Sequence, residues 1–373
     1  MRLHVDRRHE RLLELVRERG TARVADLARE LGVSPVTLRR DVEMLAAQGR
    51  LQRLHGSVVW PDDSAVREQG RTAAAPGAGT VVGMVVPTTE YYYAEVVRGA
   101  RDAVEACGAR LVVALSRYLP GEDAAQVERL LGAGADGLLL TPSWDRGEPA
   151  AGEGRWITEL PVPTVLVERS APHGHPVAAL DRVRSDHAHG AAAAVRHLAA
   201  LGHRAVALAA QESPTSGRLR LGYEAAVTAL GLTPAPRLVH DPAATEAERF
   251  EWTFAYLRGA VEEHGVSAAI LHSDADAIVL VPRLRACGVR VPDDLAVITY
   301  DDEIADLADL PLTAVAPAKR TVGRRAAELL LSRLADSAGP GQHLDILPEL
   351  RVRASCGASG GSSVTPGARS PSA

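Results

Sequence analysis

The sequence predicts an α/β protein in which a small basic module precedes a large body built on parallel sheets. Short apolar runs alternate with helical stretches from Thr80 onward, as in parallel sheets that helices cover on both faces. The length of 373 residues predicts two or three domains, and about 275 residues in the body favour two lobes. Residues 1–60 hold 12 Arg and 8 acidic side chains, whereas the rest of the chain carries a net charge of −9.

The first sixty residues predict three helices followed by a hairpin. Apolar side chains recur at helical spacing in the first two segments, and a glycine follows each of them. The last stretch alternates around a glycine, as in a small β-hairpin. The predicted segments are residues 12–16 and 24–31 for two helices, a third helix from Pro35, and residues 51–59 for the hairpin.

The third helix has the sequence of a DNA-reading helix. Ser34 is a favourable N-cap, and Pro35 suits the first helical position. A short turn before this helix crosses it against the second one, which is how a helix-turn-helix presents a helix to the major groove. Arg and Thr side chains there can meet phosphates or base edges, and those of the hairpin can meet the backbone or the minor groove. The predicted DNA contacts are Ser34, Thr37, Arg39, Arg40, Arg53 and His55.

This module resembles the DeoR family of bacterial regulators. The likeness spans about residues 7–59 and rests on the run from Val24 to Leu45 and on the hairpin sequence Arg-Leu-His-Gly that begins at Arg53. Ser57 departs from the family pattern, which has a second glycine there. The resemblance implies a winged helix-turn-helix that binds a double-stranded DNA operator.

Composition divides the chain into four parts. A stretch rich in Ala, Gly and Pro without an apolar period separates the basic module from the body, and the chain ends in a segment rich in Gly, Ser and Pro. The predicted parts are a winged helix-turn-helix at 1–60, a linker at 61–79, a two-lobed effector-binding domain at 80–356 and a disordered tail at 357–373. The predicted strands of the body are 81–86, 111–115, 137–140, 163–167, 205–208, 268–271 and 295–299.

Polar and aromatic side chains gather where the predicted strands of the body end. The C-terminal ends of parallel strands open onto a crevice in which ligands bind. Carboxylates there can accept hydroxyl hydrogens, a guanidinium can donate as a fork, and an aromatic ring can stack on a sugar. Trp144 is a candidate because of its position after the third strand. This chemistry favours a hydroxylated small molecule such as a sugar.

The body resembles the effector domain of the LacI/GalR regulators, which shares the two-lobed fold of type I periplasmic sugar-binding proteins. The matches run in order over residues 80–353 and include Pro163–Arg169 and Val291–Asp302. Family members use an Arg before a Gly–aromatic pair, and here Arg218 and Arg220 offer two registers. The LacI-type hinge helix is missing. The resemblance implies ligand contacts from Tyr92, Tyr93, Arg169, Asp186, Asp274 and Asp301.

No cofactor, metal or membrane segment is expected. Gly132, Gly134 and Gly137 match a dinucleotide-binding pattern, but they follow a helix and precede a strand, the reverse of the required order. The histidines and the three cysteines show no metal-ligand spacing, and the cysteine usage fits a reducing cytoplasm. No apolar run approaches the ~20 residues that span a bilayer. No secretory signal is visible at the N-terminus.

Two functions remain open. The first is a ligand-responsive transcription regulator, a repressor of carbohydrate-utilisation genes that a sugar or related metabolite releases from DNA, acting as a homodimer on a two-fold operator. The alternative is a cytosolic sugar-binding protein without DNA regulation, whose Arg39 and Arg40 only form surface pairs with Asp41 or Glu43. Independently of this choice, Asp301 or Asp302 has a structural alternative as a helix cap. An enzyme is not expected, because the sequence contains no catalytic constellation.

Overall fold

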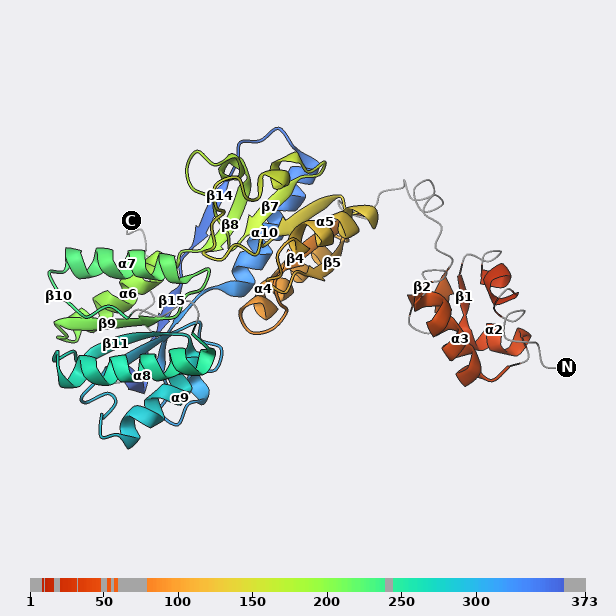
Figure 1. Ribbon diagram of the computed structural model, residues 1–373. Helices are drawn as coiled ribbons and strands as arrows, with labels where there is room; N and C mark the ends of the chain where they lie inside the picture. Colours follow the sequence, from red (N-terminus) through yellow and green to blue (C-terminus); the bar gives the residue numbers. More distant parts are fainter. Residues whose placement is uncertain are drawn as a thin grey trace, which may run out of the picture. The chain divides into compact units, whose positions relative to one another are not determined.

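The computed structural model describes residues 9, 11–16, 21–31, 33–47, 52–54, 57–59, 79–238 and 244–358. The chain forms two compact units, residues 1–74 and 75–373 (Figure 1). The predicted linker lies outside the described residues except for Gly79, and so does the predicted tail beyond Ala358. No helix among the described residues is long and apolar enough to span a membrane.

The N-terminal unit is built on one small apolar core. Residues 11–16 are helical, and helices α2 and α3 pack with them around Leu12, Leu27 and Leu38, which are fully buried. A three-stranded antiparallel sheet of order β1-β3-β2 adds Val58 to this core. The three helices and the hairpin match the prediction, whereas β1 is too short to be recognised without its partner β3. The elements are β1 Thr21–Arg23, α2 Val24–Glu30, α3 Pro35–Ala47, β2 Gln52–Leu54 and β3 Ser57–Val59.

The larger unit contains two lobes, each a sheet between two layers of helices. The sheet of the first lobe, the N-lobe, is entirely parallel with the order β14-β8-β7-β6-β4-β5. Helices α4 and α10 cover one face, and α5 with two short 3-10 helices covers the other. The elements are β4 Val81–Val86, α4 Tyr92–Ala106, β5 Arg110–Leu115, α5 Glu122–Gly132, β6 Gly137–Leu140, η1 Arg155–Glu159, β7 Thr164–Val167, η2 Pro176–Ala179, β8 Asp181–Ser185, α10 Lys319–Ala335 and β14 His343–Ile346.

The second lobe, the C-lobe, has the sheet order β10-β9-β11-β12-β13-β15, in which only the β13–β15 pair is antiparallel. Helices α8 and α9 pack on one face of this sheet, and α6 and α7 pack on the other. The elements are α6 His187–Ala200, β9 Ala205–Ala210, α7 Ser216–Ala229, β10 Thr233–Pro234, α8 Glu246–Glu262, β11 Ala268–His272, α9 Asp274–Ala286, β12 Ala296–Tyr300, η3 Ala305–Leu307, β13 Thr313–Ala316, β15 Glu349–Arg351 and η4 Ala354–Cys356.

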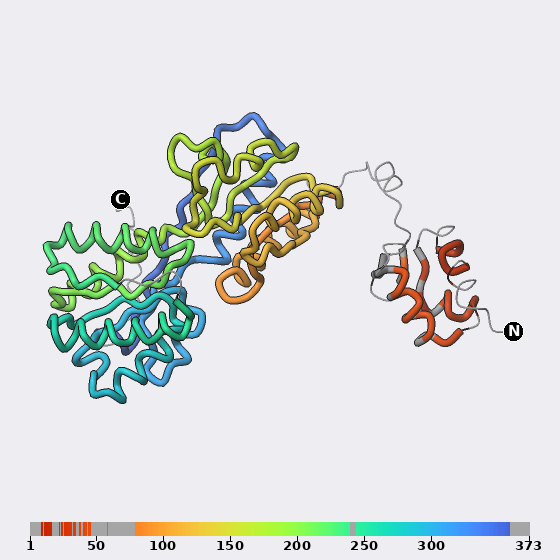
Figure 2. Tube along the Cα trace, viewed as in Figure 1, coloured from red at the N-terminus to blue at the C-terminus, as the bar shows by residue number. Residues whose placement is uncertain are grey.

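The chain passes between the two lobes three times (Figure 2). The crossings join β8 to α6, β13 to α10, and β14 to β15. In both lobes the C-terminal ends of the first strands lead into the loops that face the other lobe. The fold therefore places the strand ends that precede most of the predicted ligand residues on the facing sides of the two lobes.

Helices α4 and α10 approach each other so closely that their backbones touch. A Cβ atom at Gly99 would lie 1.9 Å from the Arg320 carbonyl oxygen, and one at Gly323 would lie 1.8 Å from that of Val96. Only glycine fits at either position without moving a helix. This contact holds α10, which returns from the C-lobe, firmly on the N-lobe sheet.

Each of the seven apolar runs predicted as strands forms a strand. Most strands that prediction missed lack a continuous apolar run, and the exception is β13, which has the sequence Thr-Ala-Val-Ala and is buried along its whole length. In β8, Asp181, Val183 and Ser185 are buried, whereas the alternate positions are Arg, because this strand lies next to the sheet edge formed by β14. The sequence of β8 is polar overall, so it does not indicate a strand of a parallel sheet unless the neighbouring strands are known.

Candidate nucleic-acid interface and effector site

Helix α3 is packed against the N-terminal unit by one face only. Leu38, Val42 and Leu45 are at most 1% exposed, whereas Arg40 and Met44 are exposed. These two sets alternate at spacings of three and four residues, which places them on opposite faces of the helix. The structure therefore leaves a face of α3 free to meet a partner.

The start of α3 is capped as expected. The Ser34 hydroxyl accepts a hydrogen bond from the Thr37 backbone N–H (3.1 Å) and lies 2.8 Å from the Thr37 hydroxyl. Near the middle of the helix, Asp41 is buried and lies 3.0 Å from His9 Nε2, which ties α3 to the first helical segment. Asp41 thus belongs to the interior of the module rather than to a surface pair.

The remaining predicted DNA contacts are described less fully. Arg39 lies on α3 and Arg53 on β2, but their side chains are outside the described part of the structure. His55 lies between β2 and β3, outside the described residues.

Strained backbone gathers at the crevice between the lobes. All non-glycine residues with positive φ in the described part of the chain follow strands β4, β5, β7 or β12. Such conformations cost about 1–3 kcal/mol each and persist where surrounding structure enforces them, often at binding sites. The six residues are Tyr91, Arg117, Tyr118, Glu168, Asp301 and Asp302.

A buried carboxylate organises the N-lobe side of this crevice. Glu168 Oε1 accepts a hydrogen bond from the Tyr92 hydroxyl (2.7 Å) and from the Ser185 hydroxyl (2.9 Å). His187 Nε2, at the start of α6, lies 3.7 Å from Glu168 Oε2. Burial alone would raise the pKa of Glu168, but the nearby His187 imidazole, with the Ser185 N–H and Tyr92, holds that pKa below its ordinary value. Tyr92, a predicted ligand residue, therefore also holds the end of β8, where the chain crosses to the C-lobe.

Arg169 contains a buried side-chain nitrogen that lacks a hydrogen-bond partner among the described residues. It is 3% exposed; its Nε donates to the Pro142 carbonyl (2.8 Å) and one terminal nitrogen donates to the Tyr93 hydroxyl (3.1 Å). The other terminal nitrogen, NH2, is buried and has no hydrogen-bond partner among the described residues. A buried charged donor without a partner is costly, so a ligand oxygen placed there would be held strongly. Tyr93 itself is 6% exposed and packs in the core.

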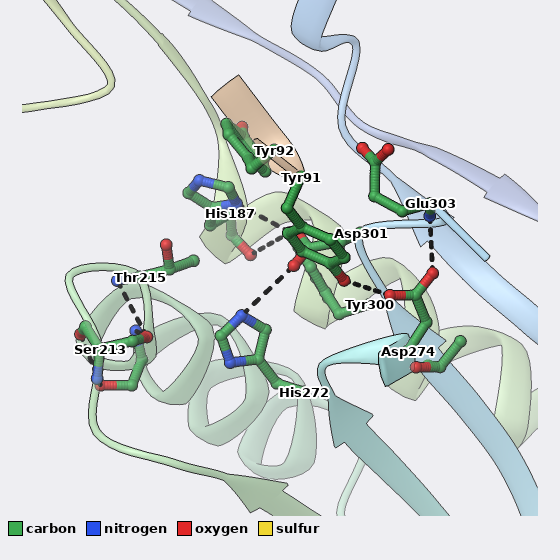
Figure 3. A network of polar contacts seen from close by, with 12 residues as sticks. Tyr91, Tyr92, His187, Ser213, Thr215, His272, Asp274, Tyr300, Asp301 and Glu303 are labelled. Atoms are coloured by element: carbon green, nitrogen blue, oxygen red, sulfur yellow. Dashed lines mark hydrogen bonds and ion pairs between the residues drawn. The ribbon is translucent and has the colours of Figure 1, made fainter. Parts of the chain in front are cut away.

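Asp274 is a link between the lobes in this structure (Figure 3). It is fully buried; its Oδ2 accepts from the backbone N–H of Glu303 (2.6 Å) and of Ile304 (2.8 Å), and its Oδ1 accepts from the Tyr91 hydroxyl. Tyr91 belongs to the N-lobe and Asp274 to the C-lobe. This differs from the expected direct ligand contact, because protein donors already satisfy the carboxylate.

A second charged group lies beside this link. Lys319 Nζ donates to the Asp301 carbonyl oxygen and to the Glu303 carboxylate. The Asp301 carboxylate lies 3.8 Å from His272 Nε2 (Figure 3). Burial raises the pKa of Asp301 and lowers the pKa of His272. Asp301 is 5% exposed, so a ligand reaches it only if the lobes move.

Two predicted ligand residues have structural roles. Trp144 is 3% exposed and packs with Ile157 and Val177 in the N-lobe core. A Cβ atom at Gly154 would lie 2.8 Å from its ring, so this glycine packs directly against it. Asp186 caps α6, because its carboxylate accepts a hydrogen bond from the His189 backbone N–H (2.9 Å). Helix capping is the structural role that the sequence also suggests for Asp301 or Asp302.

The structure separates the two arginines of α7. Arg218 reaches across to the N-lobe, where it contacts the Glu148 carboxylate and donates to the Ser170 hydroxyl (2.7 Å). Arg220 points elsewhere: it pairs with Glu212 (3.3 Å) and lines a cavity of about 220 Å³ between α7 and β10. Arg218 is therefore the one that faces the crevice.

Sequence reasoning missed several polar residues of the crevice. Apart from Tyr91, which lies between β4 and the first residue of α4, each missed residue lies within three residues of a strand end or begins the helix after it, so their position along the chain was a usable signal. The sequence alone could not predict that ionisable side chains at these strand ends and helix starts are buried, because their burial depends on the fold. The missed residues are Tyr91, Glu168, Ser185, His187, His272, Glu303 and Lys319.

Comparison with known proteins places both units. A model of the DeoR-like helix-turn-helix domain matches residues 8–64, and a model of the periplasmic binding protein-like domain matches residues 195–356. The chain is 31% identical over 274 residues to the HTH-type transcriptional regulator CelR of Thermobifida fusca, covering 71% of this chain and 76% of that protein. It is 26% identical over 352 residues to the arabinose metabolism transcriptional repressor of Geobacillus stearothermophilus, covering 88% and 89%.

A solved structure is similar to most of this chain. The transcriptional regulator CelR in complex with cellobiose aligns with a TM-score of 0.60 and 26% identity, covering 87% of this chain and 91% of that one.

Proposed function

This chain belongs to the LacI-type family of ligand-responsive, DNA-binding transcription regulators, and from that premise we propose that it represses carbohydrate-utilisation genes until a sugar or a related metabolite binds between its lobes. The observation that carries the proposal is the one-sided packing of α3 in a chain that also holds a two-lobed sensor. The named relatives are regulators of arabinose metabolism and a regulator solved with cellobiose.

In this proposal α3 enters the major groove of the operator. Arg40, exposed on the outer face, donates to a guanine edge or a phosphate, and Thr37 contacts a thymine methyl group or a phosphate. Arg39 adds a further cation on the same helix, and Arg53 and His55 on the wing contact the backbone or minor groove. The Ser34 hydroxyl is already used in capping, so its contribution is to fix the angle at which α3 begins.

The effector binds at the strand ends, and it acts by changing the relation between the lobes. Arg169 supplies an unpartnered donor, Arg218 reaches over the crevice, and Asp301 and Asp274 become available when the lobes move. The effector can shift operator affinity only by its differential affinity for two lobe arrangements, typically ~1–3 kcal/mol. A homodimer in the cytoplasm would convert this change into a new spacing of two α3 helices, which read half-sites about 34 Å apart or a multiple of this.

The experiment is a gel shift with the full chain and the DNA upstream of its own gene. Arg40→Ala should weaken binding by at least ~10-fold, because a bidentate base contact or a phosphate contact is lost. Arg129→Ala, an exposed arginine of α5 that pairs with Glu122, is the matched control for loss of one charge and should bind normally. Equal affinity of the Arg40→Ala chain and the unaltered chain would contradict the docking of α3.

The same assay discriminates the sugar-binding alternative. Operator affinity should fall steeply with salt, because each neutralised phosphate releases counterions. An affinity for DNA that is low and insensitive to salt would favour a sugar-binding protein without DNA regulation.

A further inference from the structure

Three arginines from two lobes converge beside the effector crevice. Arg182 and Arg184 are two residues apart on β8, so their side chains lie on the same face of the N-lobe sheet. Arg218 comes from α7 in the C-lobe. Arg184 and Arg218 meet at Ser170, the residue directly after Arg169, and Arg182 shares the Asp345 carboxylate with Arg184.

Ser170 is the point at which the lobes meet. Its hydroxyl accepts from Arg184 (3.0 Å) and from Arg218 (2.7 Å) and lies 3.2 Å from the Glu148 carboxylate. Asp345 on β14 accepts from Arg184 Nε (2.7 Å) and lies 3.6 Å from Arg182. Two guanidinium groups therefore share one neutral oxygen.

The charges of this cluster do not balance. Three guanidinium groups are compensated by two carboxylates, Glu148 and Asp345, which leaves one positive charge in excess. Burial, and then repulsion from Arg184, lowers the pKa of Arg182. Arg182 Nε is buried and has no hydrogen-bond partner in the part of the chain that the structure describes. The cluster has both spare charge and a spare donor.

The side chains of the cluster are partly open to solvent. The side chains of Arg182 and Arg184 are 16% and 13% exposed, and that of Arg218 is 31% exposed. They are thus partly desolvated, which strengthens charge-assisted hydrogen bonds, yet solvent reaches them.

We propose that Arg182, Arg184 and Arg218 form an oxyanion site, and that the effector carries a phosphoryl or carboxylate group which this site binds. The inference rests on the proposed function, because it names the chemical class of the effector at the same crevice. Guanidinium groups bind both oxyanions through paired N–H donors. An anion between Arg184 and Arg218 would replace the shared Ser170 oxygen and bridge the two lobes through charge-assisted hydrogen bonds.

The experiment measures the unfolding temperature of the full chain against the concentration of inorganic phosphate or of acetate, with ionic strength held constant by chloride. The unaltered chain should show a saturable rise. Arg184→Gln and Arg218→Gln should each need at least ~10-fold more anion, because a charge-assisted hydrogen bond is lost. Arg258→Gln, which removes a C-lobe surface charge paired with Glu262, is the control and should respond like the unaltered chain.

The outcomes separate the possible sources of the anion. If the unfolding temperature rises at a lower concentration of phosphate than of acetate, the effector carries a phosphoryl group. If it rises at a lower concentration of acetate, the effector carries a carboxylate. The proposal is overturned if neither anion gives a saturable response, or if both arginine variants respond like the unaltered chain. Arg218 lies on a helix surface, so its variant remains informative if Arg184→Gln folds poorly.

Operator binding by the same preparations distinguishes the two levels of the account. Normal operator binding without any anion response would contradict the oxyanion site but would agree with the proposed function as a regulator. An anion response without operator binding would agree with the oxyanion site but would contradict the proposed function.

Discussion

The hydrogen bond between Tyr91 and Asp274 links the two lobes, and Tyr91→Phe removes only its hydroxyl. Asp274 is fully buried, so its Oδ1 loses a donor that water cannot readily replace, while Oδ2 keeps the N–H groups of Glu303 and Ile304. A hydrogen bond to a charged group contributes ~1.5–3 kcal/mol. Tyr91 is 37% exposed, so water offsets part of this loss, and we expect the lower end, about a tenfold shift toward separated lobes.

Hydrogen exchange of the backbone amides provides the assay. Separation of the lobes would bring solvent to Asp274 and to the loop at Glu303 and Ile304, so these two amides should exchange faster in Tyr91→Phe than in the unaltered chain, by up to about tenfold. Tyr118→Phe is the matched control, because it removes a hydroxyl at the end of the neighbouring strand, on a side chain that is 49% exposed. Unchanged exchange in Tyr91→Phe would refute the reasoning that this contact holds the lobes.

Three further perturbations have defined outcomes. Gly323→Ala should lower the free energy of unfolding by ~1–3 kcal/mol in urea titrations, because its Cβ would lie 1.8 Å from a backbone oxygen, whereas Gly217→Ala in open space should not destabilise the chain. Burial holds the pKa of His272 below its ordinary value of 6.5, so below pH 6.5 the unfolded chain binds more protons than the folded chain. The free energy of unfolding should therefore fall as the pH drops below 6.5. In His272→Gln, urea unfolding should show a weaker dependence of this free energy on pH. Trp144→Phe should lower the unfolding temperature by the equivalent of about 1–2 kcal/mol and leave effector affinity unchanged in calorimetric titration, and a weakened affinity would return Trp144 to the site.

Elements with a strong local signal could be predicted from the sequence. The apolar spacing of Leu38, Val42 and Leu45 identifies the inner face of α3, and Ser34 identifies its first turn. The continuously apolar strands are equally plain, because burial on both faces leaves little freedom in residue type. In contrast, β8 and β14 carry alternating charged residues, and their role depends on a neighbour far along the chain.

The site could be predicted only in part, because position along the chain does not give direction in space. Trp144 follows a strand that ends at the crevice, yet its ring turns into the core. Arg218 and Arg220 are two residues apart on a helix, hence about 200° apart around its axis, and only the packing of α7 decides which one faces the N-lobe. Asp274 follows the expected strand, but its partners come from Tyr91 and the loop at Glu303.

The most direct measurement of the central claim is operator affinity with and without a bound effector. A thermal-shift screen of sugars, sugar phosphates and sugar acids identifies a compound that stabilises the full chain. Fluorescence anisotropy with the upstream DNA then gives the operator affinity at fixed salt. We predict that this compound weakens operator binding by about 5- to 150-fold, the range that a coupling of ~1–3 kcal/mol produces. A compound that stabilises the chain and leaves operator affinity unchanged would contradict the claim that the crevice controls the DNA-binding module.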